Sequence, residues 1–277
     1  MSNEAGRPLR RGGLTLRAMV PNAITAGALC VGLTGIRFAI GGEFAKAVLF
    51  VIAAGMLDGI DGRIARMLKA QSRFGAELDS LADSINFGVA PALILYLWSL
   101  QEIPRLGWFA ALAFAICCVL RLARFNARID LADEPRKAAG FLTGIPAPVG
   151  AGLAYLPLYL WIASGREEFR EPVLVGIWLV VIAFLLISAL PTLAWGKLRP
   201  RRSMRLPLIV LVALLVAGLV NEPWLTLVVI CLGYLVLIPV GIVSYARIRR
   251  QRGGREAARG PAGTGAGDGT EGRPPSP

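Results

Sequence analysis

The stretch FAKAVLFVIAAGMLDGIDGRIARMLKAQSRFGAELDSLAD, residues 44–83, decides the fold of this chain. Its first part, residues 44–57, is apolar, but fourteen residues of helix are only about 21 Å long, less than the roughly 30 Å hydrocarbon core of a bilayer. A membrane-spanning helix must therefore continue into the polar part of the stretch. Two aspartates then end that helix and two begin the next, so we expect four carboxylates to converge: Asp58, Asp61, Asp79 and Asp83.

The sequence on either side of this stretch is typical of an integral membrane protein. Of its 277 residues, 55% are hydrophobic and 17% are charged, and the mean hydropathy of +0.61 is too high for a soluble domain. We therefore expect an all-α polytopic membrane protein, with a six-helix core followed by a C-terminal pair of helices. Apolar runs predict about eight transmembrane helices, at residues 23–40, 44–66, 78–100, 107–126, 146–164, 173–195, 206–220 and 224–245.

Positive charges sort to one side of these predicted spans. If both termini are cytoplasmic, 25 of the 30 Lys and Arg fall in cytoplasmic segments, as the positive-inside rule requires. This sorting predicts an even number of spans and a cytoplasmic position for the four aspartates, in a bacterial-type inner membrane. The net charge of +12 then reflects topology and attraction to anionic headgroups, so we expect membrane lipids and no nucleic acid as partners.

The four aspartates predict a site for hard cations. Clustered carboxylates at apolar depth repel one another unless they are protonated or bind a cation. Because the ligands are all oxygens and the chain contains no histidine, Mg²⁺ or Mn²⁺ is favoured over zinc, and two ions bridged by shared carboxylates are expected for phosphoryl transfer. On the same helix, the small residues Gly62 and Ala65 would let a bulky ligand such as a nucleotide approach the backbone. Arg63 and Arg66 could neutralise its phosphate oxygens.

The residues alone leave two other interpretations open. Asp58 and Asp61 could cap an interfacial turn, Asp79 could pair with Arg73, and the nearby glycines could be contacts between packed helices. The acids could also relay ions in an ion-coupled membrane transporter, although such a protein would spread acidic residues through its spans instead of collecting them at one interface.

The pattern D-x-x-D-G-x-x-A-R-x8-G-x3-D-x3-D, from Asp58 to Asp83, resembles the signature of the CDP-alcohol phosphatidyltransferases. Those membrane enzymes move a phosphatidyl or related group from a CDP-linked donor to an alcohol and release CMP. The resemblance covers residues 20–195 and leaves out the last two spans. It implies that two divalent ions are bound by Asp58, Asp61, Asp79 and Asp83, with Asp83 also the catalytic base. It further implies a donor-binding set for the CDP moiety at Gly62, Ala65 and Arg66, to which we add Arg63 and Gly75.

Three segments resemble the phosphatidylserine synthase branch of that family: FGAELDSLADSINFGVAPA (74–92), RLARFN (121–126) and FLTGIPAP (141–148). The branch implies CDP-diacylglycerol and L-serine as substrates, and phosphatidylserine and CMP as products. Other acceptors, namely glycerol 3-phosphate, inositol phosphate or choline, are the alternatives within the family. A serine carboxylate needs a cation, and the candidates for acceptor binding are Arg121 and Arg124, with Asn86 and Asn126 as polar partners. The two arginines could equally be ordinary anchors at the membrane surface.

The chain is expected to divide into four parts: a cytoplasmic basic N-terminus at 1–19, a six-helix catalytic core at 20–200, two additional transmembrane helices at 201–250 and a disordered cytoplasmic tail at 251–277. The tail is rich in Gly, Pro, Ala and Arg without apolar periodicity, so it cannot bury enough surface to offset its ordering entropy. A homodimer is common in the family and is expected on that ground alone.

Overall fold

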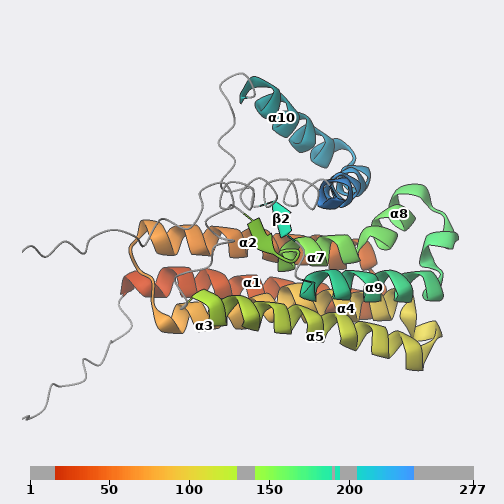
Figure 1. Ribbon diagram of the computed structural model, residues 1–277, viewed down its shortest axis with the longest axis horizontal. Helices are drawn as coiled ribbons and strands as arrows, with labels where there is room; N and C mark the ends of the chain where they lie inside the picture. The colour runs from red at the N-terminus through yellow and green to blue at the C-terminus, as the bar shows by residue number, and fades with distance from the viewer. Residues whose placement is uncertain (1–15, 130–140, 189–190, 194–204, 240–277) are drawn as a thin grey trace, which may run out of the picture.

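The computed structural model describes residues 16–129, 141–188, 191–193 and 205–239, which form a bundle of long helices (Figure 1). The prediction of a helical fold is confirmed for this part of the chain. Six rods build the bundle, and the third and fifth are composite. The rods are α1 (Leu16–Ile40), α2 (Phe44–Met67), α3 (Arg73–Asp83) with η1 (Ser84–Val89) and α4 (Ala90–Trp98), α5 (Pro104–Ile129), α7 (Ala147–Ala154) with α8 (Leu156–Ser164), and α9 (Pro172–Ile187).

The sequence predicts eight transmembrane helices, but fewer of the described helices are long and apolar enough to cross a membrane. Three are long and apolar enough, Met19–Ile40, Arg73–Trp98 and Pro104–Ala127, and the bent pair α7–α8 makes a fourth if it counts as one span. The helix α2 forms as expected, but every 18-residue stretch of it carries at least three charged residues. The helix α9 has only 16 residues and ends at Ile187, because the backbone of Ser188 is already extended, so it is shorter than the expected span 173–195.

The first two rods form a tight hairpin. Their connection turns at Gly42, whose φ of +78° lies in the left-handed region that glycine adopts without strain. The helices then run close together, since a Cβ at Gly35 would lie 2.8 Å from the carbonyl oxygen of Ala47. Near the turn, the rings of Phe38 and Phe50 pack at a centroid distance of 4.8 Å.

The third rod begins earlier than expected and contains a wide turn. Ser72 caps it, with its hydroxyl accepting a hydrogen bond from the backbone N–H of Gly75 at 3.0 Å, so the helix starts at Arg73 instead of residue 78. The π-helix Ser84–Val89 follows directly after Asp83. Such wide turns are frequent at functional sites, and this one shifts the residues beyond Asp83 relative to the aspartates.

The fifth rod bends by 41° where α7 meets α8. Pro157 lies in the first turn of α8, and a proline cannot bond to the carbonyl four residues earlier, here that of Leu153. The indole N–H of Trp178 on α9 donates to this carbonyl at 2.9 Å instead. The break is therefore compensated by a neighbouring rod, which fixes α9 against α7.

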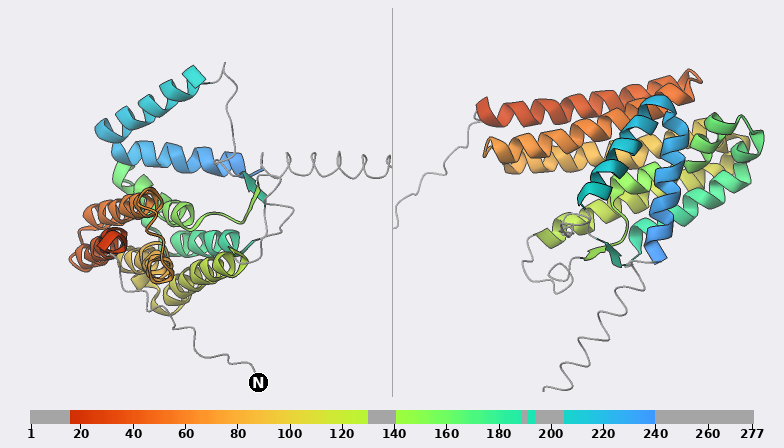
Figure 2. Two further views of the ribbon diagram at one scale, coloured as in Figure 1. Left: turned by 90° about the vertical axis from the view of Figure 1, so that its left-hand side faces the viewer. Right: turned by 90° about the horizontal axis from the view of Figure 1, so that it is seen from above.

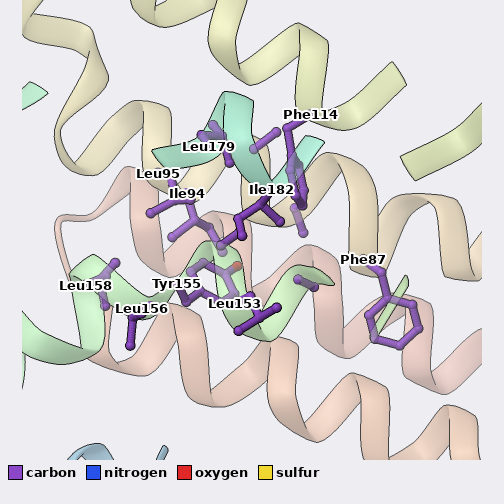
Figure 3. Close-up of a cluster of buried hydrophobic side chains, with 14 of the residues drawn as sticks. Phe87, Ile94, Leu95, Phe114, Leu153, Tyr155, Leu156, Leu158, Leu179 and Ile182 are labelled. Carbon is purple, nitrogen blue, oxygen red and sulfur yellow. The ribbon is translucent and has the colours of Figure 1, made fainter. Parts of the chain in front are cut away.

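The apolar core draws on all six rods, and Figure 3 shows the part of it formed by η1, α4, α5, α7, α8 and α9. Its largest fully buried side chains include Trp98, Tyr155, Tyr159 and Phe114. At the end of the bundle remote from the aspartates, Arg170 donates to the carbonyl of Trp98 at 3.0 Å, next to the short helices η2 (Leu100–Glu102) and η3 (Glu167–Arg170). This hydrogen bond joins η3 to α4 at that end of the bundle.

Two features lie outside the six rods. The strands β1 (Phe141–Thr143) and β2 (Pro191–Leu193) pair antiparallel, with Leu142 opposite Thr192, a short addition to the expected all-α fold. The helices α10 (Arg205–Asn221) and Pro223–Pro239 form a hairpin on one side of the bundle (Figure 2). The second of them packs on the core, where the thiol of Cys231 lies 3.5 Å from the carbonyl of Gly152. Most of the predicted N-terminal segment 1–19 and all of the tail 251–277 lie outside the described residues.

Candidate metal centre

Three of the four aspartates come together at one end of the bundle. Asp58, Asp61 and Asp79 each offer a carboxylate oxygen, and these oxygens lie within 4.8 Å of one another. Asp61 is 2% exposed and the other two are half-buried. Because α2 continues to Met67, Asp58 and Asp61 lie inside a helix, and they do not cap an interfacial turn.

The fourth aspartate joins the same cluster. The Asp83 carboxyl lies within hydrogen-bonding reach of the Asp58 carboxyl and close enough to Asp79 and Asp61 for their charges to interact. Asp79 and Asp83 are one turn apart on α3, so both face the end of α2. The expected convergence of two acidic pairs from consecutive helices is therefore seen in the structure.

No salt bridge joins a protein cation to this cluster within the part of the chain that the structure describes. The one salt bridge recorded there joins Lys46 to Glu43, at the other end of α2, so the pairing of Asp79 with Arg73 that the sequence allowed does not form. One oxygen each of Asp58, Asp61 and Asp83 is buried without a hydrogen-bond partner. Buried carboxylate oxygens in this state are costly, and the all-oxygen donor set fits Mg²⁺ or Mn²⁺.

The helix α1 adds two polar residues that sequence reasoning missed. The hydroxyl of Thr25 donates to Oδ2 of Asp61 at 2.5 Å, and the side chain of Asn22, one turn earlier, lies against the start of α3. A Cβ at Gly75 would lie 2.8 Å from Oδ1 of Asn22, so this glycine lets α3 approach α1 closely. The available signal was two polar side chains three residues apart at the start of an apolar run.

The predicted donor-binding residues follow the aspartates on the outer surface of α2. Gly62, Arg63 and Arg66 are exposed and Ala65 is half-buried. A Cβ at Gly62 would meet no atom within 4 Å, so space remains beside the helix there. The Nε of Arg66 donates to the Gly62 carbonyl at 3.0 Å, and its two terminal nitrogens make no contact that the structure records.

The predicted acceptor-binding residues lie in different surroundings. Arg121 is near enough to Asp83 for their charges to interact, and its Nε is buried without a partner. Arg124 donates to the carbonyl of Ile187 at 3.1 Å, and Asn126 donates to the hydroxyl of Ser80 at 2.8 Å. Asn86 is fully buried in η1, packed so tightly on α1 that a Cβ at Gly32 would lie 2.0 Å from its Oδ1.

A helical bundle with long apolar rods and an uncompensated acidic cluster at one end defines a class: integral membrane proteins with a candidate divalent-cation site. Within that class, the chain belongs to the CDP-alcohol phosphatidyltransferase family, whose sequence model matches residues 18–195. That match agrees with the predicted limits 20–195. A second model, CDP-alcohol phosphatidyltransferase 2, matches residues 203–239, so the C-terminal pair of helices, expected outside the resemblance, has a family match of its own.

Several similar proteins carry the name CDP-diacylglycerol–serine O-phosphatidyltransferase. One from Mycobacterium tuberculosis H37Rv is 39% identical over 239 residues, which cover 86% of this chain and 83% of the relative. One from Mycobacterium leprae is also 39% identical, over 85% of this chain and 78% of the relative. One from Bacillus subtilis is 35% identical over 169 residues, 61% of this chain and 86% of the relative.

Proposed function

We propose that this protein transfers the phosphatidyl group of CDP-diacylglycerol to the hydroxyl of L-serine, giving phosphatidylserine and CMP. The observation that carries this proposal is the 39% identity, over most of both chains, to relatives named for that reaction. The convergence of all four signature aspartates in one cluster supports it independently, because sequence identity alone does not require those side chains to meet.

Asp58, Asp61, Asp79 and Asp83 are proposed to hold the divalent cations, two ions of Mg²⁺ or Mn²⁺. Their unpartnered buried oxygens, and the absence of a salt bridge from the cluster to any described residue, support this assignment. Bound there, the ions would neutralise charge on the pyrophosphate of the donor. Gly62 leaves room beside α2, because a Cβ there would meet no atom within 4 Å, and Gly75 lets α3 pack closely on α1. The exposed arginines Arg63 and Arg66 on α2 are proposed to contact phosphate oxygens.

Asp83 is proposed as the base. It accepts the proton of the serine hydroxyl while the serine oxygen forms a bond to the phosphorus that carries diacylglycerol, and the bond from that phosphorus to CMP breaks. CMP leaves with the electron pair of the broken bond, so no covalent enzyme intermediate is needed. The surroundings of Asp83 support this role, since it lies in the cluster and near enough to Arg121 for their charges to interact.

Arg121 is proposed to bind the serine carboxylate. Its buried, unpartnered Nε supports this choice over Arg124 and Asn126, whose side chains already bond Ile187 and Ser80. Asn86 is buried on the same rod as Asp83 with both polar atoms unpartnered, so it is the second candidate for a polar contact to the acceptor.

The lipid part of the donor is proposed to enter from the bilayer. A cavity of about 220 Å³ lies between α2, η1 and the bent pair α7–α8. Its lining is mainly apolar and includes Gly55, Met56, Phe87 and Tyr155, and Gly55 lies three residues, about one helical turn, before Asp58. An apolar pocket about one helical turn from Asp58 supports this route of entry, because acyl chains require an apolar surface.

The protein is proposed to lie in a bacterial-type inner membrane, with the six rods and the C-terminal pair as its eight spans and with both termini and the active site in the cytoplasm. Membrane lipids are its proposed partners, and a homodimer is proposed from the family alone. The sorting of 25 of 30 positive residues supports this orientation.

The deciding experiment measures CMP release by the purified full chain from CDP-diacylglycerol with Mn²⁺ or Mg²⁺. We expect release that depends on serine and stops when EDTA removes the metal. Parallel reactions contain glycerol 3-phosphate, inositol phosphate or choline in place of serine. Release that depends on one of these and not on serine would contradict the proposed acceptor and keep the reaction class.

A further inference from the structure

A threonine on α1 reaches across to the aspartate cluster. The hydroxyl of Thr25 lies 2.5 Å from Oδ2 of Asp61 and 3.1 Å from the carbonyl of Pro21, four residues earlier on the same helix. A hydroxyl has one proton to donate, and a carboxylate oxygen is a stronger acceptor than a neutral carbonyl. The shorter distance and the stronger acceptor both assign that proton to Asp61.

This hydrogen bond is shielded from water, because Thr25 is 4% exposed and Asp61 is 2% exposed. It occupies one oxygen of Asp61, while the other oxygen, Oδ1, is buried without a partner. The bond also joins α1 to α2, so it fixes the rotation of the carboxyl group within the helix pair. Asp61 thus presents one free oxygen in a set orientation, next to Asp58 and Asp79.

We propose that Thr25 is a positioning residue for the metal centre, holding Asp61 in the orientation in which it binds the divalent cation. Thr25 has this role only if the metal-dependent function proposed above holds. Hydrogen bonds from outer groups to metal ligands typically contribute 10–100-fold to metal affinity, since they order the ligand before the ion arrives.

The chain offers a matched control on the same helix. Thr34 on α1 donates to the carbonyl of Cys30 at 2.7 Å, the same four-residue spacing as Thr25 and Pro21, and contacts no aspartate. Thr34→Val therefore removes a threonine hydroxyl from α1 without touching the cluster. Thr25→Val removes the bond to Asp61, whereas Thr25→Ser keeps a hydroxyl at the same position.

The experiment titrates purified full-length protein with Mn²⁺ and measures free Mn²⁺ by electron paramagnetic resonance, so it does not depend on turnover. We expect Thr25→Val to weaken Mn²⁺ binding by about 10–100-fold. Thr25→Ser and Thr34→Val should keep the affinity of the unmodified protein. In the CMP assay, Thr25→Val should need correspondingly more Mn²⁺ for half-maximal rate, with an unchanged KM for serine once Mn²⁺ is saturating.

Unchanged Mn²⁺ affinity in Thr25→Val, or an equal loss in Thr34→Val, would overturn the role of Thr25. If Thr25→Val does not fold, Thr25→Cys is measured in its place, because a thiol is similar in size to a hydroxyl but is a weak hydrogen-bond donor. If Thr25→Cys then binds Mn²⁺ as tightly as Thr25→Ser does, the role of Thr25 is overturned. If the unmodified protein binds no Mn²⁺, the proposed metal centre fails together with the role of Thr25. Mn²⁺ binding without serine-dependent CMP release would overturn the proposed acceptor alone.

Discussion

Asp83 lies in the acidic cluster and, unlike the other three aspartates, its charge interacts with that of Arg121. Asp83→Asn keeps the size of the side chain but removes its ability to accept a proton. We expect the rate of CMP release at saturating Mn²⁺ to fall by about 10²–10⁴-fold, with normal membrane insertion. The control is Glu77→Gln, which removes an exposed acid on the same helix and should leave the rate unchanged. Near-normal turnover of Asp83→Asn would exclude Asp83 as the base.

Arg121 and Arg124 lie one turn apart on α5 but have different partners. Arg121→Gln leaves the serine carboxylate without its proposed cation, so we expect kcat/KM for serine to fall by roughly 10–100-fold with little change in KM for CDP-diacylglycerol. Arg124→Gln loses its bond to Ile187 at the end of α9, so we expect a lower melting temperature and a smaller change in KM for serine. Steady-state kinetics and thermal unfolding separate the two. An equal rise in KM for both variants would contradict this ranking.

The sequence predicted the four aspartates because acids in apolar segments are conspicuous, and it missed Thr25 because threonine is not. A threonine within a helix ordinarily bonds the carbonyl one turn back, as Thr34 does, and nothing local distinguishes Thr25 from it. Only the packing of α1 on α2 brings its hydroxyl to Asp61. The partners of Arg124 and Asn126 could not be foreseen for the same reason, since Ile187 is 63 residues away and Ser80 is 46 residues away.

Among the helices, the close contact of α1 with α2 decides whether Thr25 can reach Asp61. Gly35→Ala would place a Cβ 2.8 Å from the carbonyl of Ala47 and 3.2 Å from Val51, neither of which can yield easily. We expect a destabilisation of about 1–3 kcal/mol, measured as a lower unfolding temperature in detergent. The control is Gly27→Ala on the same helix, where a Cβ meets no atom within 4 Å and should stabilise the helix slightly. Equal melting temperatures for the two variants would contradict this packing.

The ends of a helix could be predicted where the thickness of the bilayer constrains its length. They could be predicted less well where a single cap residue or proline determines them. The continuation of α2 through Asp58 followed from the shortness of its apolar part. The early start of α3 at Arg73 depends on the Ser72 cap, which hydropathy does not detect. The bend between α7 and α8 requires both Pro157 and the indole of Trp178, which lies on another rod.

Successive rods run in opposite directions, so the connections between them alternate between the two ends of the bundle. The start of α1 and the ends of α2, α5 and α9 all lie at the end of the bundle that carries the aspartates, as shown by the contacts of Thr25 with Asp61, Asn126 with Ser80 and Arg124 with Ile187. The loops before α5 and α9 meet at the opposite end, where Ser99 bonds the carbonyl of Arg170. Six rods that begin and end on one side agree with the even number of spans that the charges predict.

This arrangement predicts the sidedness of the connections. Gln71, in the connection between α2 and α3, and Glu102, at the opposite end, are both exposed. With the four native cysteines replaced by alanine, Gln71→Cys should react with an impermeant maleimide only after the membrane is opened, whereas Glu102→Cys should react in intact cells, because the basic end is proposed to face the cytoplasm. CMP release by each variant shows that it is folded. Labelling of Gln71→Cys in intact cells would place the aspartates on the outer face, where cytoplasmic CDP-diacylglycerol and serine could not meet them.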